Sequence, residues 1–275
     1  MTVSVNFEGF PWFCVIIHEK LSGRVVKMKA ELIALLDELS STGGNYNTTA
    51  LIAIRRKFMN FLSQDEYLLH YENDENMLIA KDALHFIDAY NTYAVTNDRV
   101  ESSKHLQFFF KRLIDAEKWN YYELAFLVSS LNITESTKQA LVLIDKAYKM
   151  IDIFKADVRS ELIEGHLATN VLSVLLGARF SGDHGGIHLE SEFDRWFFKL
   201  EMLAEKNTEL KILLDTSEIR QAVFNLNSRL MNQLFQKFES SYDEKIVKAL
   251  GKEVDAYIAS KKYTELYSEH LESLS

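Results

Sequence analysis

The chain has 275 residues, of which 47% are apolar and 26% are charged, an ordinary composition for a globular protein. Its one proline and ten glycines are too few for the many turns of an all-β sandwich or barrel, and they exclude collagen-like and low-complexity chains. The formal charge of −9 opposes binding to nucleic acid, because an acidic chain repels phosphate backbones.

Residues 1–22 differ from the rest of the chain because they are rich in aromatic residues and contain Pro11. We interpret this segment as a hinge or linker. Its Cys14 is the single cysteine of the chain and has no partner for an intrachain disulfide, which is typical of the reducing cytosol. The segment lacks the basic leader of a signal peptide, and no stretch reaches the roughly 18 uncharged apolar residues of a membrane span. We therefore expect a cytoplasmic protein without membrane contact.

From residue 23 onward, apolar residues recur at the three- and four-residue steps that are typical of amphipathic helices. The pattern predicts helices from Val25 to Leu39, from Thr48 to Leu62, and over residues 77–94, 101–116 and 216–238. Between them lie polar breaks such as 96–99, and Gly251 is expected to interrupt the penultimate helix. We expect about ten helices, packed as antiparallel hairpins that stack into an all-α superhelical repeat with a concave face.

Two patterns near residue 185 resemble functional sites, but each also fits an ordinary turn. His184 and His188 are four residues apart, which on a helix would present two imidazoles to a metal, but Gly185 and Gly186 oppose a helix there. The sequence SGDHGG at 181–186 has no preceding strand and no following Lys-Ser/Thr, so it indicates a turn rather than a phosphate-binding loop. We expect neither a metal nor a cofactor.

Arg159 and His166 match the loose Arg-x4–6-His pattern of HEPN ribonucleases, in which the arginine holds phosphate and the histidine moves protons. Such a spacing also arises by chance, and both residues then have solvated or pairing roles. The chain contains no Gly-x-Ser-x-Gly motif and no plausible cysteine nucleophile. We therefore expect a protein that is not an enzyme.

Asn170 follows a run that is otherwise apolar, including Leu167, Leu172 and Leu175. An asparagine that faces a groove donates to and accepts from a peptide backbone, which is how helical-repeat receptors hold extended ligands. The alternative is that Asn170 bonds a neighbouring helix. The sequence does not decide between these two roles.

Three segments together resemble the C-terminal region of the Rgg/GadR/MutR family of bacterial transcriptional regulators. They are VSVNFEGF at 3–10, FFFKRLIDAEKWNYYELAFL at 108–127 and VRSELIEGHLATNVLSVLL at 158–176. The resemblance implies a right-handed repeat similar to tetratricopeptide repeats, with a sensor and dimerisation domain over 23–275. Family members form homodimers through their C-terminal region, and several bind short secreted hydrophobic peptides, as in quorum sensing. The helix-turn-helix domain of the family does not precede residue 3 here.

In this resemblance, Arg159 and Asn170 match the positions that would contact a peptide. From helical spacing we add Arg220, Phe224 and Asn227 as further ligand-binding candidates. Phe224 would supply an apolar pocket, and either arginine would bind a terminal carboxylate in a bidentate manner. The apolar residues of 240–275 are expected to form the interface of a two-fold homodimer.

The sequence therefore favours a non-enzymatic regulatory protein that binds a short hydrophobic peptide on a concave helical face. The alternatives are a HEPN-type RNase or toxin that uses Arg159 and His166, and an interaction scaffold with no small ligand. Because of the charge of −9 and the missing helix-turn-helix domain, we do not expect direct binding to nucleic acid.

Overall fold

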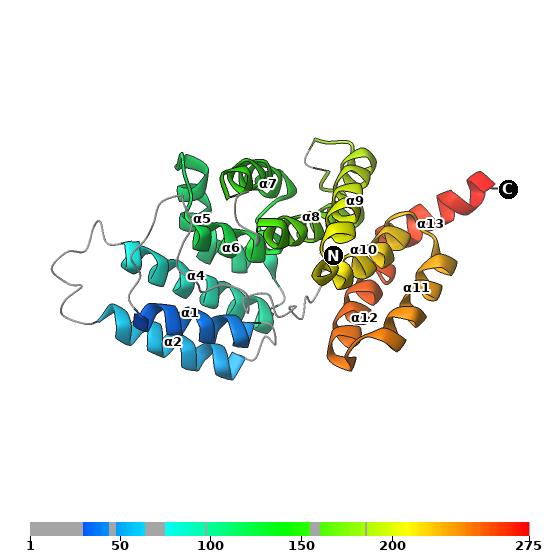
Figure 1. Ribbon diagram of the computed structural model, residues 1–275. Helices are drawn as coiled ribbons and strands as arrows, with labels where there is room; N and C mark the ends of the chain where they lie inside the picture. Colours follow the sequence, from blue (N-terminus) through cyan, green and yellow to red (C-terminus); the bar gives the residue numbers. More distant parts are fainter. Residues whose placement is uncertain are drawn as a thin grey trace. The chain divides into compact units, whose positions relative to one another are not determined.

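The computed structural model describes residues 30–43, 48–63, 75–96, 98–154, 160–184 and 186–274. These residues contain twelve α-helices, three short 3₁₀ helices and no strand, which confirms the predicted all-α class (Figure 1). The proposed linker over 1–22, including Cys14, lies outside the described residues. The finer prediction of a right-handed superhelical repeat stays a prediction.

The helices form two compact units, which we describe separately. The N-terminal unit contains α1 (Ala30–Gly43), α2 (Thr48–Leu62), α4 (Glu75–Thr96), α5 (Arg99–Asp115), α6 (Tyr121–Ser130), η1 (Leu131–Ile133) and η2 (Asp152–Phe154). The C-terminal unit contains α8 (Ser160–Ser181), α9 (Leu189–Lys206), η3 (Thr208–Leu210), α10 (Lys211–Phe224), α11 (Ser228–Ser241), α12 (Glu244–Ile258) and α13 (Lys261–Leu274). Helix α7 (Thr137–Ile151) contributes its first part to the C-terminal unit and its second part to the N-terminal unit.

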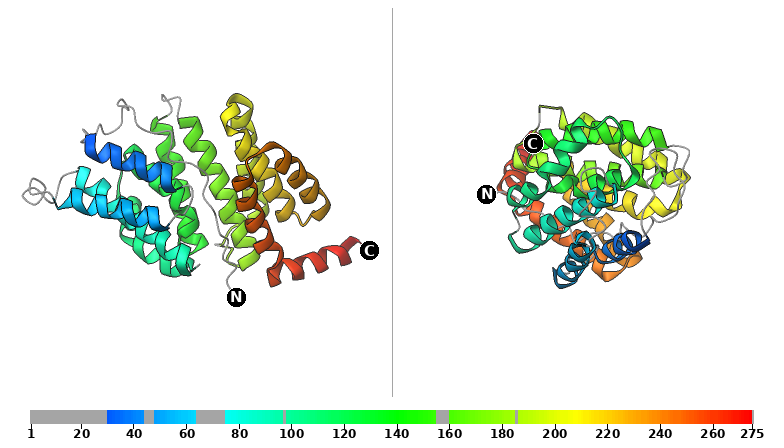
Figure 2. Two further views of the ribbon diagram at one scale, coloured as in Figure 1. Left: turned by 90° about the horizontal axis from the view of Figure 1, so that it is seen from below. Right: turned by 90° about the vertical axis from the view of Figure 1, so that its left-hand side faces the viewer.

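The N-terminal unit is built around aromatic side chains. Helix α2 packs against both α1 and α4, and α4 packs against α5 and α6 (Figures 1 and 2). Phe126 of α6 is buried, with its ring centroid 5.5 Å from that of Phe86 and 6.4 Å from that of Phe109. The indole N–H of buried Trp119 donates to the carbonyl oxygen of Leu113 (3.0 Å), so the ring is held at the end of α5. Burial of large aromatic area dominates the stability of such a core.

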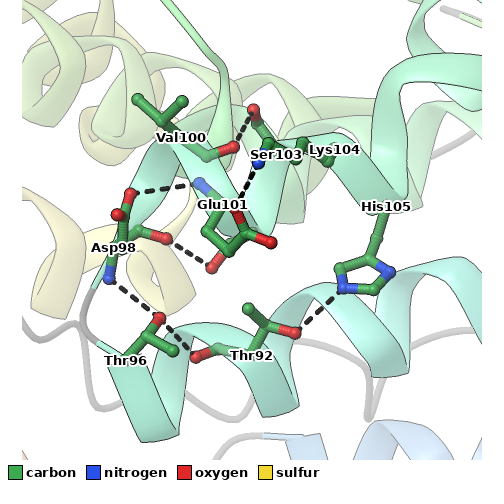
Figure 3. A network of polar contacts seen from close by, with 9 residues as sticks. Thr92, Thr96, Asp98, Val100, Glu101, Ser103, Lys104 and His105 are labelled. Atoms are coloured by element: carbon green, nitrogen blue, oxygen red, sulfur yellow. Dashed lines mark hydrogen bonds and ion pairs between the residues drawn. The ribbon is translucent and has the colours of Figure 1, made fainter.

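Side-chain hydrogen bonds define the turn between α4 and α5 (Figure 3). The hydroxyl of Thr96 donates to the carbonyl oxygen of Thr92 (2.8 Å) and accepts from the N–H of Asp98 (3.1 Å). The Asp98 carboxylate accepts from the N–H of Glu101 (3.0 Å) and so caps α5. The hydroxyl of Thr92 also lies 2.9 Å from Nε2 of His105, which links the two helices. The predicted break at 96–99 is confirmed, and the ends of α4 and α5 lie within two residues of the predicted ends.

Helix α8 contacts several elements of the C-terminal unit. It packs against α9, α10, η3 and α13, while α10 also packs against α11 and α12 (Figures 1 and 2). No described helix in either unit combines the length and the apolar character needed to cross a lipid bilayer.

The helix predicted over 216–238 is two helices, and Gly251 does not interrupt α12. The chain breaks where Leu226 adopts a φ of 58°, and the side chain of Asn227 then caps α11. The apolar spacing continues across this break, so the period alone does not reveal it. In α12 a Cβ on Gly251 would lie 3.3 Å from Cζ of Phe235, so the glycine allows α11 to approach closely.

Candidate functional site

All the described candidate ligand residues lie in the C-terminal unit, but they do not share one surface. Asn170 lies in α8, Arg220 and Phe224 lie in α10, and Asn227 precedes α11. Arg159 lies outside the described residues, and its peptide-binding role and its pairing with His166 stay predictions.

Arg220 belongs to an internal ion pair. It is completely buried, and its Nε and Nη2 donate to Oε1 and Oε2 of Glu253 in α12, at 2.8 and 2.9 Å. Such a bidentate pair joins α10 to α12. The guanidinium that we assigned to a ligand carboxylate from helical spacing therefore binds a carboxylate of the chain itself, and we leave Arg220 out of the candidate site.

Phe224 and Asn227 also have roles within the fold. Phe224 is buried, with its ring stacked on that of Phe193 (4.2 Å between centroids) and the guanidinium of Arg179 4.4 Å from its centroid. The side-chain oxygen of Asn227 accepts from the N–H of Leu230 (3.0 Å) as the N-cap of α11. Leu172 and Leu175, the apolar neighbours of Asn170 in the sequence, are fully buried and form no part of an accessible surface.

One narrow stripe of α8 is partly accessible and carries no charge. It consists of Leu162, His166, Asn170, Ser173 and Gly177, which we call the α8 stripe. The spacings of 4, 4, 3 and 4 residues place all five on one side of the helix. Four of them are partly exposed, whereas nearly all other residues of α8 are buried. Apart from buried Ser173, the stripe is therefore a partly accessible side of this helix.

The other sides of α8 are covered by specific contacts. Glu164 pairs with Lys199 of α9 (2.6 Å), and the hydroxyl of Thr169 lies 3.4 Å from that of Ser217 in α10. A Cβ on Gly165 would lie only 2.6 Å from a methyl carbon of Leu210, so η3 packs directly on the helix backbone there. The ring of Phe180 packs on Tyr257 of α12 and Tyr263 of α13. These contacts fix the rotation of α8 and hence the direction of the stripe.

The α8 stripe offers hydrogen-bonding groups of both kinds in an uncharged setting. Burial lowers the pKa of His166 well below 6.5, so its imidazole is neutral and carries one donor and one acceptor. Asn170 carries a donor and an acceptor on one amide. The hydroxyl of Ser173 is buried and has no hydrogen-bond partner in the described part of the chain. Gly177 presents no side chain, which allows a ligand backbone to approach.

The glycine-rich loop is structural. Gly182 and Gly186 adopt φ values of 79° and 81°, a left-handed conformation that glycine tolerates best, so the predicted turn at SGDHGG is confirmed. Its Asp183 carboxylate accepts from the N–H of Thr137 (2.9 Å) at the start of α7. Within the described ranges no group of three or more His, Cys, Asp or Glu side chains is arranged to hold a metal ion.

No protein-family model, no curated protein and no solved structure matches the chain. The candidate site therefore rests on its geometry. Sequence reasoning had singled out His166 and Asn170 but missed Ser173 and Gly177. Their spacing from Asn170, three and seven residues, was visible in the sequence and places them on the same helical side.

Proposed function

We propose that the chain is a non-enzymatic regulatory protein whose C-terminal unit binds a short, uncharged, hydrophobic peptide along the α8 stripe. The observation that carries the proposal is the stripe itself, in which the uncharged polar side chains of His166 and Asn170 lie on a partly exposed side of a helix that is otherwise mostly buried. A peptide backbone needs donors and acceptors without net charge, and the imidazole of His166 and the amide of Asn170 carry both kinds.

The length of the stripe agrees with such a ligand. At 1.5 Å per residue, the 15 steps from Leu162 to Gly177 span about 22 Å, the length of roughly six or seven residues in extended form. A charged ligand is disfavoured, because the five residues contain no group to pair with it and burial keeps His166 neutral. The resemblance to Rgg-type regulators supports the same class of ligand and a role in transcriptional control.

Homodimerisation through 240–275 is part of this proposal. Helix α13 carries a stripe at steps of three and four residues, Tyr263, Leu266, Tyr267 and Leu271. Tyr263 is buried against Phe180, whereas Leu271 at the other end is 51% exposed. A second copy that covers the exposed end would continue the packing that begins at Tyr263.

Replacing Asn170 with alanine tests the proposal. We expect the affinity for short uncharged peptides rich in leucine, isoleucine, valine and phenylalanine to fall about fivefold to thirtyfold, the equivalent of about 1–2 kcal/mol for a lost hydrogen bond. Isothermal titration calorimetry gives the affinity and circular dichroism gives the melting curve.

Asn232→Ala is the matched control, because Asn232 is an exposed residue inside α11 of the same unit. This variant should bind the same peptides as the wild type does. An Asn170→Ala protein that melts several degrees lower and keeps full affinity would assign Asn170 to the fold and remove it from the site.

A further inference from the structure

A buried cluster of three charged groups joins three helices of the N-terminal unit. Arg112 of α5 donates from Nη2 to the carboxylate of Asp82 in α4 and from Nη1 to the carboxylate of Glu123 in α6. The side chains of Asp82 and Glu123 are only 2% and 8% exposed. Two carboxylates and one guanidinium leave the cluster with one excess negative charge away from water, which is costly.

The carboxylate of Glu123 accepts more hydrogen bonds than the carboxylate of Asp82 does. The second oxygen of Glu123 accepts from the N–H of Asn120 (2.7 Å), and the N–H of Glu123 donates to the side-chain oxygen of Asn120 (2.9 Å). This capping box uses the second carboxylate oxygen of Glu123 as an acceptor for a backbone N–H, in addition to the oxygen that accepts from Arg112. Among the described residues, Arg112 is the hydrogen-bond donor that Asp82 has. The excess charge is therefore most readily neutralised by a proton on Asp82.

The charges that act on Asp82 come from α5 and α6. Burial is the largest effect on the pKa of Asp82 and raises it, Arg112 lowers it, Glu123 raises it, and the result is about 7. The basic residues of α2 pair with other carboxylates. Arg55 binds Asp88 (2.6 Å), which lies further along α4 than Asp82. Lys57 of α2 binds Glu38 of α1 (2.6 Å).

We propose that Asp82, Arg112 and Glu123 form a one-proton switch that stabilises the packing of α4, α5 and α6 when the proton is bound. With the proton on Asp82 the cluster is neutral, because the positive charge of the guanidinium balances the negative charge of Glu123. The unprotonated oxygen of Asp82 still accepts a hydrogen bond from Nη2 of Arg112. Loss of the proton leaves the excess negative charge between the three helices. The N-terminal unit therefore senses pH near neutrality, independently of any peptide bound by the C-terminal unit.

The direction of the effect follows from linkage. The pKa of Asp82 is 3.8 in the unfolded chain and about 7 in the folded one, so the folded chain takes up a proton between these values. The stabilisation is complete below the unfolded pKa and is lost as the pH rises through 7. His85 acts in the opposite direction, because burial lowers its pKa below 6.5 and stability falls when it must be protonated. His166, whose pKa burial also lowers, acts in the same direction as His85, and comparing Asp82→Asn with the wild type cancels both histidine effects.

Thermal melts of the full chain between about pH 6.5 and 8.5 test the switch. The contribution of Asp82 should lower the wild-type melting temperature by about 2 °C as the pH rises over this range. In Asp82→Asn, which mimics the neutral form, this fall should be largely lost, and the variant should melt higher than the wild type at the alkaline end. Asp145→Asn, which changes an exposed aspartate of α7, should keep the wild-type slope.

Infrared spectroscopy of the folded wild-type chain gives an independent readout, even if a variant folds poorly. A protonated-carboxyl band should be present at the acid end of this range and disappear at the alkaline end. A wild-type slope that persists unchanged in Asp82→Asn would overturn the proposal, and so would the absence of this band at pH 6.5.

Discussion

Replacing Arg220 with alanine is expected to lower the free energy of unfolding of the C-terminal unit by about 3–5 kcal/mol. The change would leave the carboxylate of Glu253 buried in α12 without the guanidinium that now donates to both of its oxygens. Breaking a buried pair from one side is costly because the remaining charge is desolvated and uncompensated. Urea denaturation followed by circular dichroism measures the loss.

The control is Arg195→Ala in α9. Arg195 is exposed and pairs with Glu192 at 3.2 Å, and such surface pairs contribute about 0–1 kcal/mol. Removing both buried charges at once, with Arg220→Met and Glu253→Leu, should recover much of the stability lost in the single variant, because no unpaired charge remains. If Arg220→Ala were as mild as Arg195→Ala, the internal ion pair would not have the structural role assigned to it.

Replacing Phe224 with alanine is expected to cost about 3–5 kcal/mol of unfolding free energy. The ring is buried between Phe193 and the guanidinium of Arg179, so its removal leaves a cavity and ends both contacts. Denaturant titration gives the change, and Phe198→Ala is the control, because Phe198 of α9 is 63% exposed. A Phe224→Ala protein with wild-type stability but weakened peptide binding would show that Phe224 belongs to the ligand-binding surface.

The helices were predictable from sequence because their apolar residues repeat with a helical period. α2, α4 and α5 lie close to their predicted positions for that reason. The break between α10 and α11 was not predictable in this way. It depends on the positive φ of Leu226, and the apolar spacing runs through it without interruption.

The roles of individual side chains depended on partners distant in sequence. Arg220 meets Glu253, 33 residues away, and Asp82 meets Arg112, 30 residues away. Helical spacing places a residue on a side of its helix, but tertiary packing decides whether that side is buried. For α8, nearly every position is small or apolar, so the sequence does not reveal which side the neighbouring helices leave open.

The peptide-binding claim is tested most directly by nuclear magnetic resonance of the side-chain amide of Asn170. Its signal is assigned by its absence from Asn170→Ala, and the full chain is titrated with the same leucine-, isoleucine-, valine- and phenylalanine-rich peptides. The account predicts a saturable shift of the Asn170 amide signal, while the amide signal of exposed Asn232 stays in place. Peptide binding that leaves the Asn170 signal unmoved, or no binding by any of these peptides, would contradict it.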